Sequence, residues 1–300
     1  MTLPRVVATP AELDAGLAGV RGDNRRIALV PTMGAVHEGH LGLVETAREH
    51  SDLVVASVFV NPTQFGPGED YERYPRDLDR DVELLGGAGV DLVFAPDVET
   101  MYPPGTETVM VDPGELGQIL EGEFRPTHFR GVLTVVAKLF ALVRPCTAIF
   151  GEKDYQQLVL VRKLAHALHT GVEVVGRPIV RDADGLAKSS RNVYLSDAER
   201  KTALTLSHAL HDGASAAPRG GAAVLQAARG VLNATNDIDV DYLALTDADL
   251  GVPVAGAPAR LLVAARVGST RLIDNLGFDL PQAVGLGFDM QPVPEGEGRC

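Results

Sequence analysis

One stretch of this chain carries more structural information than any other: Ile27-Ala28-Leu29-Val30-Pro31-Thr32-Met33-Gly34-Ala35-Val36-His37-Glu38-Gly39-His40. The apolar run Ile27–Val30 is typical of a buried strand, and the pattern of Leu41–His50 predicts a helix. A strand that ends in a glycine-containing turn and then opens a helix leaves backbone N–H groups unpaired at the turn. Two imidazoles three positions apart, His37 and His40, add movable hydrogen-bond donors. The stretch therefore predicts a phosphate site, and we expect a nucleotide as its ligand.

Length and composition limit the classes of protein to which the chain can belong. Its 300 residues predict one large domain or two smaller ones, and 45% of them are hydrophobic, enough for an ordinary core. No run approaches the roughly 18 uncharged apolar residues of a membrane span, and Met1–Arg5 lacks the features of a secretory signal. Cys146 and Cys300 do not make a disulfide framework. We expect a reduced, cytoplasmic protein with no membrane contact.

The charge balance argues against nucleic acid as a partner. The formal net charge is −13, whereas phosphate backbones are held by basic surfaces. A small anionic ligand is still compatible with this charge. An acidic protein that binds ATP must gather its few cations in one cleft, so each clustered Lys or Arg gains weight.

Apolar and amphipathic segments alternate through the first 180 or so residues, which predicts βαβ units and a doubly wound parallel sheet. The predicted strands are Ile27–Val30, Leu53–Val60, Leu92–Ala95, Val109–Val111, Thr147–Phe150 and Val172–Val175. The predicted helices are Leu41–His50, Asp77–Leu85, Val132–Val143 and Tyr155–His169. Ligands of such sheets bind beyond the carboxyl ends of the strands, where the residues of interest fall.

The pattern changes after Val180, and we divide the chain into residues 1–180, 181–282 and 283–300. The sequence Arg181–Leu186 contains Asp184-Gly185, a hairpin signal. The helices predicted beyond it are Asp197–His211 and Ala222–Leu232, and the strands are Val240–Leu245 and Leu261–Val267. We expect a smaller α+β domain over 181–282 and a flexible tail over 283–300, which is rich in Gly and Pro.

Two further segments offer cations at the same predicted sheet edge. Gly151-Glu152-Lys153-Asp154 follows a strand; Lys153 can reach a phosphate, and Asp154 or the glycine backbone can accept from ribose hydroxyls. Lys188-Ser189-Ser190-Arg191-Asn192 offers two cations and two hydroxyls that can close over a triphosphate. Each segment alone also fits a simpler role, as a helix cap at Asp154 or as a polar loop before an N-cap at Ser196 or Asp197. Their joint occurrence favours the nucleotide site.

Other polar residues have open interpretations. Metal ligation is the alternative role of His37 and His40, but the helical zinc pattern needs i, i+4 spacing, and no nearby cysteine completes a site. Gln64 and Gln157 each lie near a strand–helix junction, where they can bind the oxygens of a small polar acid. Arg125 and Arg130 are candidate partners of a carboxylate or phosphate, and a solvent-facing role fits them equally.

The ordered motifs resemble those of the pantothenate synthetase (pantoate–β-alanine ligase) family over about nine-tenths of the chain. They are Val30-Pro31-Thr32-Met33-Gly34-Ala35-Val36-His37-Glu38-Gly39-His40, Phe59-Val60-Asn61-Pro62-Thr63-Gln64-Phe65, Tyr74-Pro75-Arg76, Arg125-Pro126-Thr127-His128-Phe129-Arg130-Gly131-Val132, Phe150-Gly151-Glu152-Lys153-Asp154-Tyr155-Gln156-Gln157-Leu158 and Ser189-Ser190-Arg191-Asn192. The resemblance implies a Rossmann-like domain of nucleotidyltransferase type, a smaller carboxyl-terminal domain and a cytoplasmic homodimer.

The resemblance also implies a reaction with ATP and Mg²⁺. The carboxylate of pantoate attacks the α-phosphorus of ATP and expels pyrophosphate, and the amine of β-alanine then displaces AMP from the enzyme-bound pantoyl adenylate. The residues implied to contact ATP are Met33, Gly34, Ala35, Val36, His37, Glu38, Gly39, His40, Gly151, Glu152, Lys153, Asp154, Val180, Lys188, Ser189, Ser190 and Arg191. The residues implied to take part in catalysis are His37, His40, Lys153, Ser189 and Arg191, with His37 as a proton donor. Gln64 and Gln157 are implied to hold pantoate.

Three points stay open at the level of sequence. Lys188 stands where the family usually has Met or Leu, so no side-chain role carries over to it. The Mg²⁺ ligands are not identified, and Asp81 is only a guess. Two rival functions remain: a related nucleotidyltransferase that releases a nucleotide-containing product, and a non-catalytic nucleotide-binding module.

Overall fold

The larger part of the molecule is built on a parallel sheet. The structure, a computed structural model, describes residues 3–105 and 108–282. Within this part the sheet contains β1 (Arg5–Val7), β2 (Ile27–Thr32), β3 (Leu53–Val58), β4 (Leu92–Phe94), β5 (Cys146–Gly151) and β6 (Val172–Arg177). All neighbouring strands are parallel, in the order β1-β4-β3-β2-β5-β6. The prediction of a doubly wound parallel sheet is confirmed, with the order reversing between β2 and β5.

Helices cover both faces of this sheet. The main ones are α1 (Pro10–Gly22), α2 (Glu38–His50), α3 (Leu78–Ala88), α6 (His128–Val143) and α7 (Tyr155–Ala167). On β2, Ile27 and Leu29 pack into the core that contains α1, α6 and α7, whereas Ala28 and Val30 pack into the core that contains α2 and α3. Successive strand residues point to opposite faces, so a strand covered on both sides must be apolar throughout.

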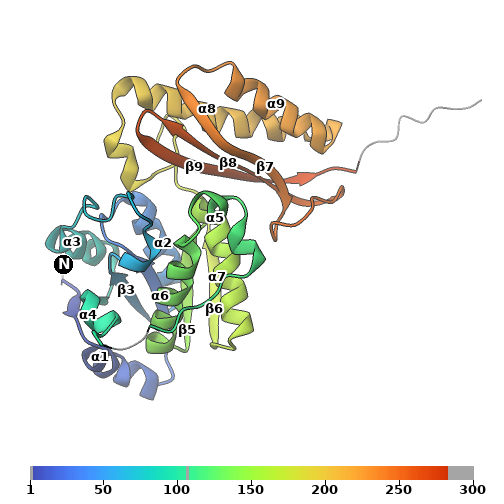
Figure 1. The fold of residues 1–300 in the computed structure, drawn as a ribbon. Helices are drawn as coiled ribbons and strands as arrows, with labels where there is room; N and C mark the ends of the chain where they lie inside the picture. Colours follow the sequence, from blue (N-terminus) through green and yellow to red (C-terminus); the bar gives the residue numbers. More distant parts are fainter. Residues whose placement is uncertain (1–2, 106–107, 283–300) are drawn as a thin grey trace, which may run out of the picture.

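The smaller part is an antiparallel sheet with two helices on one face. It contains α8 (Asp197–Ser215), α9 (Gly221–Asn233), β7 (Ile238–Asp247), β8 (Ala257–Val267) and β9 (Thr270–Leu280), with strand order β7-β8-β9. Figure 1 shows α8 and α9 on the outer face of this sheet, while its other face looks toward the larger unit. Leu261 and Val263 of β8 accordingly pack with α8 and α9, whereas Leu262 joins the core of the larger unit.

A hairpin connects the two units. Arg181 pairs with Ala187 in an antiparallel bridge, and Gly185 has a φ of +96°, as the Asp184-Gly185 signal predicts. Helix α8 then begins after Ser196, whose side chain forms a reciprocal capping box with Glu199. The division of the chain at residue 180 stays a prediction, with this hairpin immediately beyond it.

Short elements complete the larger unit. They are η1 (Pro62–Gln64), α4 (Val98–Met101), η2 (Glu115–Gln118), α5 (Glu121–Phe124) and η3 (Glu152–Asp154); η4 (Ser190–Tyr194) and η5 (Ala217–Arg219) follow later in the chain. Within the described ranges, none of the helices combines the length and apolar character needed to cross a membrane.

Some elements differ from the prediction. Val109–Val111 is not a strand: Val109 is 87% exposed, and the N–H of Val111 donates to the Thr134 hydroxyl at 2.9 Å instead of to a neighbouring strand. The sequence reading also missed β1, α1 and β9. The predicted flexible tail, 283–300, lies outside the described residues.

Candidate functional site

The three segments singled out in the sequence line one cavity. It opens at the carboxyl ends of β2, β3 and β5 and is bordered by the chain around the inter-unit hairpin. Its lining includes fourteen of the predicted site residues: Met33, His37, Gly39, His40, Gln64, Gly151, Lys153, Asp154, Gln157, Val180, Lys188, Ser189, Ser190 and Arg191. The predicted phosphate turn, the Lys153 segment and the Ser189–Arg191 segment therefore face the same space.

Five of the predicted residues do not line the cavity: Gly34, Ala35, Val36, Glu38 and Glu152. Glu38 forms an ion pair with Lys188, and Glu152 forms one with Arg260 of β8. Contact of these five residues with ATP stays a prediction. Their protein contacts indicate that they shape the segments that surround the cavity.

The turn after β2 is held from behind by Asp81 of α3. Its carboxylate accepts from the N–H groups of Ala35 at 2.9 Å and Val36 at 2.8 Å. Gly34 has a φ of +83°, and a Cβ there would lie 2.6 Å from Asp81 Oδ2, so only glycine fits. Asp81 is 1% exposed and does not line the cavity, so the guess that it binds Mg²⁺ finds no support in this geometry.

The two imidazoles of the turn are neutral donors. The Nδ1 of His37 accepts from the N–H of Gly39 at 3.1 Å, and the Nδ1 of His40 accepts from the N–H of His37 at 3.3 Å. Burial, followed by the nearby Lys153 charge, lowers the pKa of His37 to about 4. Burial, followed by His37, lowers the pKa of His40 to about 3. A neutral ring that accepts at Nδ1 carries its proton on Nε2, so each ring presents an N–H donor.

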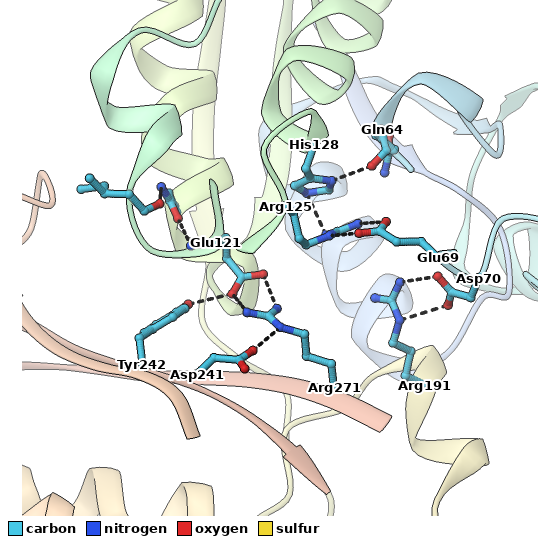
Figure 2. Close-up of polar contacts among 12 residues, drawn as sticks. Gln64, Glu69, Asp70, Glu121, Arg125, His128, Arg191, Asp241, Tyr242 and Arg271 are labelled. Carbon is cyan, nitrogen blue, oxygen red and sulfur yellow. Dashed lines mark hydrogen bonds and ion pairs between the residues drawn. The ribbon is translucent and has the colours of Figure 1, made fainter. Parts of the chain in front are cut away.

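Most cations around the cavity are paired with carboxylates. Arg125 binds both oxygens of Glu69 at 2.8 and 2.7 Å, and Arg191 binds both oxygens of Asp70 at 3.1 and 2.9 Å (Figure 2). Burial opposes ionisation of Asp70, but the hydrogen bonds from Arg191 hold the pKa of Asp70 below its ordinary value.

Two lysines complete the cationic lining of the cavity and differ in their pairing. Lys188 forms ion pairs with Asp182 and Glu38. Lys153 has no carboxylate partner within the described residues. Lys153 can therefore bind an anionic ligand without first breaking an ion pair.

The turn that carries Gln64 is fixed by helix α6. His128 is buried, which together with Arg125 lowers its pKa to about 4, and its Nδ1–H donates to the carbonyl of Gln64 at 3.0 Å. Gly131 allows α6 to approach closely, because a Cβ there would lie 2.2 Å from the carbonyl oxygen of Thr63. The side-chain oxygen of Gln64 accepts from Asn61 at 3.0 Å, which orients the amide.

Gln157, from the first turn of α7, makes no side-chain hydrogen bond to the described residues, so its amide is free for a ligand. An apolar wall stands beside these amides, made of Val132, Val135, Val136, Leu139 and Phe150. A ligand held here by two amides is partly shielded from water.

The sequence reading missed the supporting role of two residues: Asp81, which it named only as a guess for a Mg²⁺ ligand, and His128. Asp81 lies among the buried residues Val82 and Leu85 on one face of α3, and a lone carboxylate in that apolar pattern is a signal that could have been used. His128 was quoted only as part of a motif. Its contact with the Gln64 carbonyl spans 64 residues, and no local pattern reveals it.

Comparison with known proteins agrees with this geometry. The family model described as Pantoate-beta-alanine ligase matches residues 5–277. Pantothenate synthetase of Nocardia farcinica is 54% identical over 289 residues, covering 96% of this chain and 91% of the relative. That of Corynebacterium jeikeium is 59% identical over 270 residues, covering 90% of this chain and 87% of the relative.

Solved structures give the same picture. The crystal structure of pantothenate synthetase from Thermus thermophilus matches with a TM-score of 0.84 at 54% identity, covering 91% of this chain and 98% of that one. The pantoate-beta-alanine ligase from Francisella tularensis, complexed with beta-gamma ATP and beta-alanine, matches with a TM-score of 0.76 at 30% identity. This match covers 91% of this chain and 97% of that one.

Proposed function

Because this chain belongs to the pantoate–β-alanine ligase family, we propose that its cavity is where ATP activates pantoate and where β-alanine captures the activated acid. The chain is an ATP-dependent acid–amine ligase that condenses pantoate with β-alanine to give pantothenate, AMP and pyrophosphate. The observation that carries the assignment of the cavity is the convergence of Lys153, His37 and His40 on one space that also holds two amides.

The chemistry proceeds in two displacements. A carboxylate oxygen of pantoate attacks the α-phosphorus of ATP, the bond to the bridging oxygen breaks, and pyrophosphate leaves. The amine of β-alanine then attacks the acyl carbon of the pantoyl adenylate, AMP leaves with its oxygen, and the amine loses a proton. Adenylation is needed because a bare carboxylate oxygen is a poor leaving group.

The first displacement brings an anion to a polyanion, so the main task of the enzyme is to cancel charge. Lys153 approaches the phosphates as a cation without a competing carboxylate, and the Nε2–H groups of His37 and His40 donate to phosphate oxygens. Ser189 and Arg191 bind the departing pyrophosphate. To do so, the Arg191 guanidinium must break its ion pair with Asp70 and bind phosphate oxygens instead. With pKa values lowered to about 4 and 3, the free imidazoles act at neutral pH as hydrogen-bond donors.

In this proposal pantoate binds beside the two side-chain amides of the cavity. Gln64 and Gln157 hold its hydroxyl and carboxylate oxygens, and the apolar wall formed by α6 and Phe150 packs against its carbon skeleton. The same wall limits the access of water to the adenylate, which would otherwise be hydrolysed. Val180 and Lys188 also line the cavity, and in this proposal Val180 and the backbone of Lys188 contact the nucleotide.

Mg²⁺ is proposed as the companion of the ATP phosphates. Such an ion usually keeps several waters and takes one or two carboxylates besides the phosphates. Asp154 fits this need, because it lines the cavity and its side chain makes no capping hydrogen bond with α7. No group of three or more His, Cys, Asp or Glu side chains gathers into a metal site among the described residues. The ion would supply charge neutralisation at the phosphates.

A homodimer and a cytoplasmic location are also proposed, on the family resemblance and, for the location, on the use of cysteine. Size-exclusion chromatography with light scattering tests the dimer. The dimer proposal would be wrong if the active protein has the mass of a single 31.7-kDa chain.

The test of the catalytic site is Lys153→Ala. We expect adenylation, followed as pyrophosphate release in a single turnover with ATP and pantoate, to slow by about 10²–10³-fold, as for the loss of one preorganised charge partner. Lys163→Ala, on the exposed side of α7, is the matched control because it removes the same charge. Near-normal adenylation by Lys153→Ala would remove Lys153 from the mechanism.

The same assay separates the ligase from its two rivals. Adding β-alanine must release AMP and form an amide, which a nucleotidyltransferase with a stable nucleotide-containing product does not do. A non-catalytic module would bind ATP and release no pyrophosphate.

A further inference from the structure

A residue of the smaller unit hydrogen-bonds to the backbone of the turn that carries Lys153. Asn275 lies on β9, 122 residues further along the chain than Lys153. Its side-chain Nδ2 donates to the carbonyl of Glu152 at 2.9 Å and to the carbonyl of Lys153 at 3.0 Å. Both hydrogens of the amide are thus used on the two consecutive peptide groups that set the direction of the Lys153 side chain.

The orientation of the Asn275 amide is fixed by its partners. Its Oδ1 accepts from Arg260 at 2.8 Å, and an arginine can only donate. The two carbonyls on the other side can only accept, so they must face the NH₂ group. The side chain is 2% exposed, so water does not replace these hydrogen bonds.

Arg260 gives the amide a rigid support. Its guanidinium also reaches Glu152 Oε2 at 3.2 Å and lies over the ring of Tyr155 at 3.8 Å. On the other side it lies against Gly277 of β9, where a Cβ would be 3.0 Å from the guanidinium carbon. The smaller unit therefore binds both the backbone and the side chain of the turn from Glu152 to Asp154.

Within the part of the chain that the structure describes, no carboxylate fixes the side chain of Lys153. Its side chain has no ion pair within the described residues, and the short turn η3 that bears it has no side-chain cap. A flexible lysine can compensate for small movements, but a shift of its backbone changes where the ammonium lies relative to the α-phosphorus. A misplacement of about 1 Å can cost on the order of 10²-fold in rate.

We propose that Asn275 is a positioning residue for Lys153, and that the smaller unit takes part in adenylation by holding this turn through the Asn275 amide. The proposal rests on the role of Lys153 stated under Proposed function. Asn275 does not line the cavity, so it acts only through the turn.

The principal variant is Asn275→Asp, which keeps the shape of the side chain and an acceptor for Arg260 but turns an oxygen toward two carbonyl oxygens. We expect the adenylation kcat to fall about 10–100-fold, with the KM for ATP and pantoate changed by less than about 3-fold. The matched control is Tyr242→Phe. It removes the 2.9 Å hydrogen bond from Tyr242 to Glu121 across the same inter-unit face (Figure 2), away from the turn, and we expect its adenylation rate to stay within about 2-fold of the parent.

A double-mutant cycle with Lys153→Met distinguishes positioning from general destabilisation. If Asn275 acts through Lys153, Asn275→Asp has less than about a 2-fold further effect on a protein that already carries Lys153→Met. An equal loss in both backgrounds would overturn the proposal and leave the role of Lys153 intact. Full adenylation activity of Lys153→Met alone would instead refute the role of Lys153, and with it the premise.

Folding is monitored by the thermal unfolding midpoint of each variant. If Asn275→Asp does not yield folded protein, Asn275→Ser, which keeps one donor, enters the same cycle with the same expected non-additivity. A Tyr242→Phe variant that loses as much activity as the Asn275 variant would also overturn the proposal, because any loosening of the two units would then have the same effect.

Discussion

Gly34→Ala is the substitution whose effect the structure defines most sharply. Alanine at a φ of +83° costs about 1–2 kcal/mol in backbone strain. Its Cβ would also lie 2.6 Å from Asp81 Oδ2, so the carboxylate must move away from the N–H groups of Ala35 and Val36. Each hydrogen bond to this charged group contributes about 1.5–3 kcal/mol, and a shifted carboxylate keeps about half of that. Together with the backbone strain, the expected loss of unfolding free energy is about 2.5–5 kcal/mol.

The matched control is Gly171→Ala in the turn before β6. Gly171 has a φ of +70°, but a Cβ there would meet nothing within 4 Å, so only the backbone cost of about 1–2 kcal/mol applies. Urea unfolding followed by circular dichroism measures both variants. The exchange of pyrophosphate into ATP in the presence of pantoate reports on the site.

We expect this exchange to slow by about 10²-fold for Gly34→Ala and to be unchanged for Gly171→Ala, because the turn at Gly34 leads directly to His37. Equal destabilisation of the two variants, with normal exchange in both, would refute the account of Asp81 as the support of this turn.

Three further predictions follow from pKa values and ion pairs. The folded pKa values of His37 and His40 lie below the ordinary 6.5, so on acidification the unfolded chain takes up protons first. The contribution of these two histidines to stability without ATP should therefore fall as the pH drops from about 6.5 to about 3, and urea midpoints that stay level over this range would contradict this. Lys188→Met should change the adenylation rate by less than about 3-fold, because the Lys188 ammonium is already paired with Asp182 and Glu38. A single-turnover rate that falls as far as that of a catalytic-residue variant would give the Lys188 side chain a direct role. Burial raises the pKa of the Cys146 thiol to about 12, so peptide mapping after iodoacetamide treatment of the native protein should find Cys146 unmodified, and rapid labelling would show that it is accessible.

The sequence was sufficient for the features that depend on local periodicity. The continuous apolar runs of β2, β3 and β5 predicted strands buried on both faces, and the alternation with helices predicted their parallel arrangement. The glycine and histidine pattern after β2 predicted the edge of the sheet at which the cavity lies. These signals are strong because each arises within about ten residues of chain.

The errors arise where partners are distant in the sequence. Val109–Val111 has strand-forming residues, but among residues 3–105 and 108–282 no strand pairs with this segment, and the N–H of Val111 donates to the Thr134 hydroxyl instead. Strand β1 has only three residues, and its partner β4 lies more than eighty residues further along the chain, so no local pattern marks β1 as a strand.

The supports of the site show the same limit. Asp81 reaches the turn at Ala35 across 46 residues, and Asn275 reaches Lys153 across 122. Sequence patterns identify groups that are suited to meet a ligand. They do not show which distant carboxylates and amides hold those groups in place, because that depends on how distant segments pack within the larger unit, as for Asp81, and between the two units, as for Asn275.

The long separation between Lys153 and Asn275 has a consequence for synthesis of the chain on the ribosome. At about 5–20 residues per second, the 122 residues between them take roughly 6–24 s to be made. The parallel sheet of the larger unit ends at Arg177, so this unit can fold during the interval. The carbonyls of Glu152 and Lys153 have no hydrogen bond from Asn275 until β9 is made. A nascent chain arrested before β9 should therefore form the parallel sheet without full adenylation activity. Full activity should appear only after β9 has been synthesised.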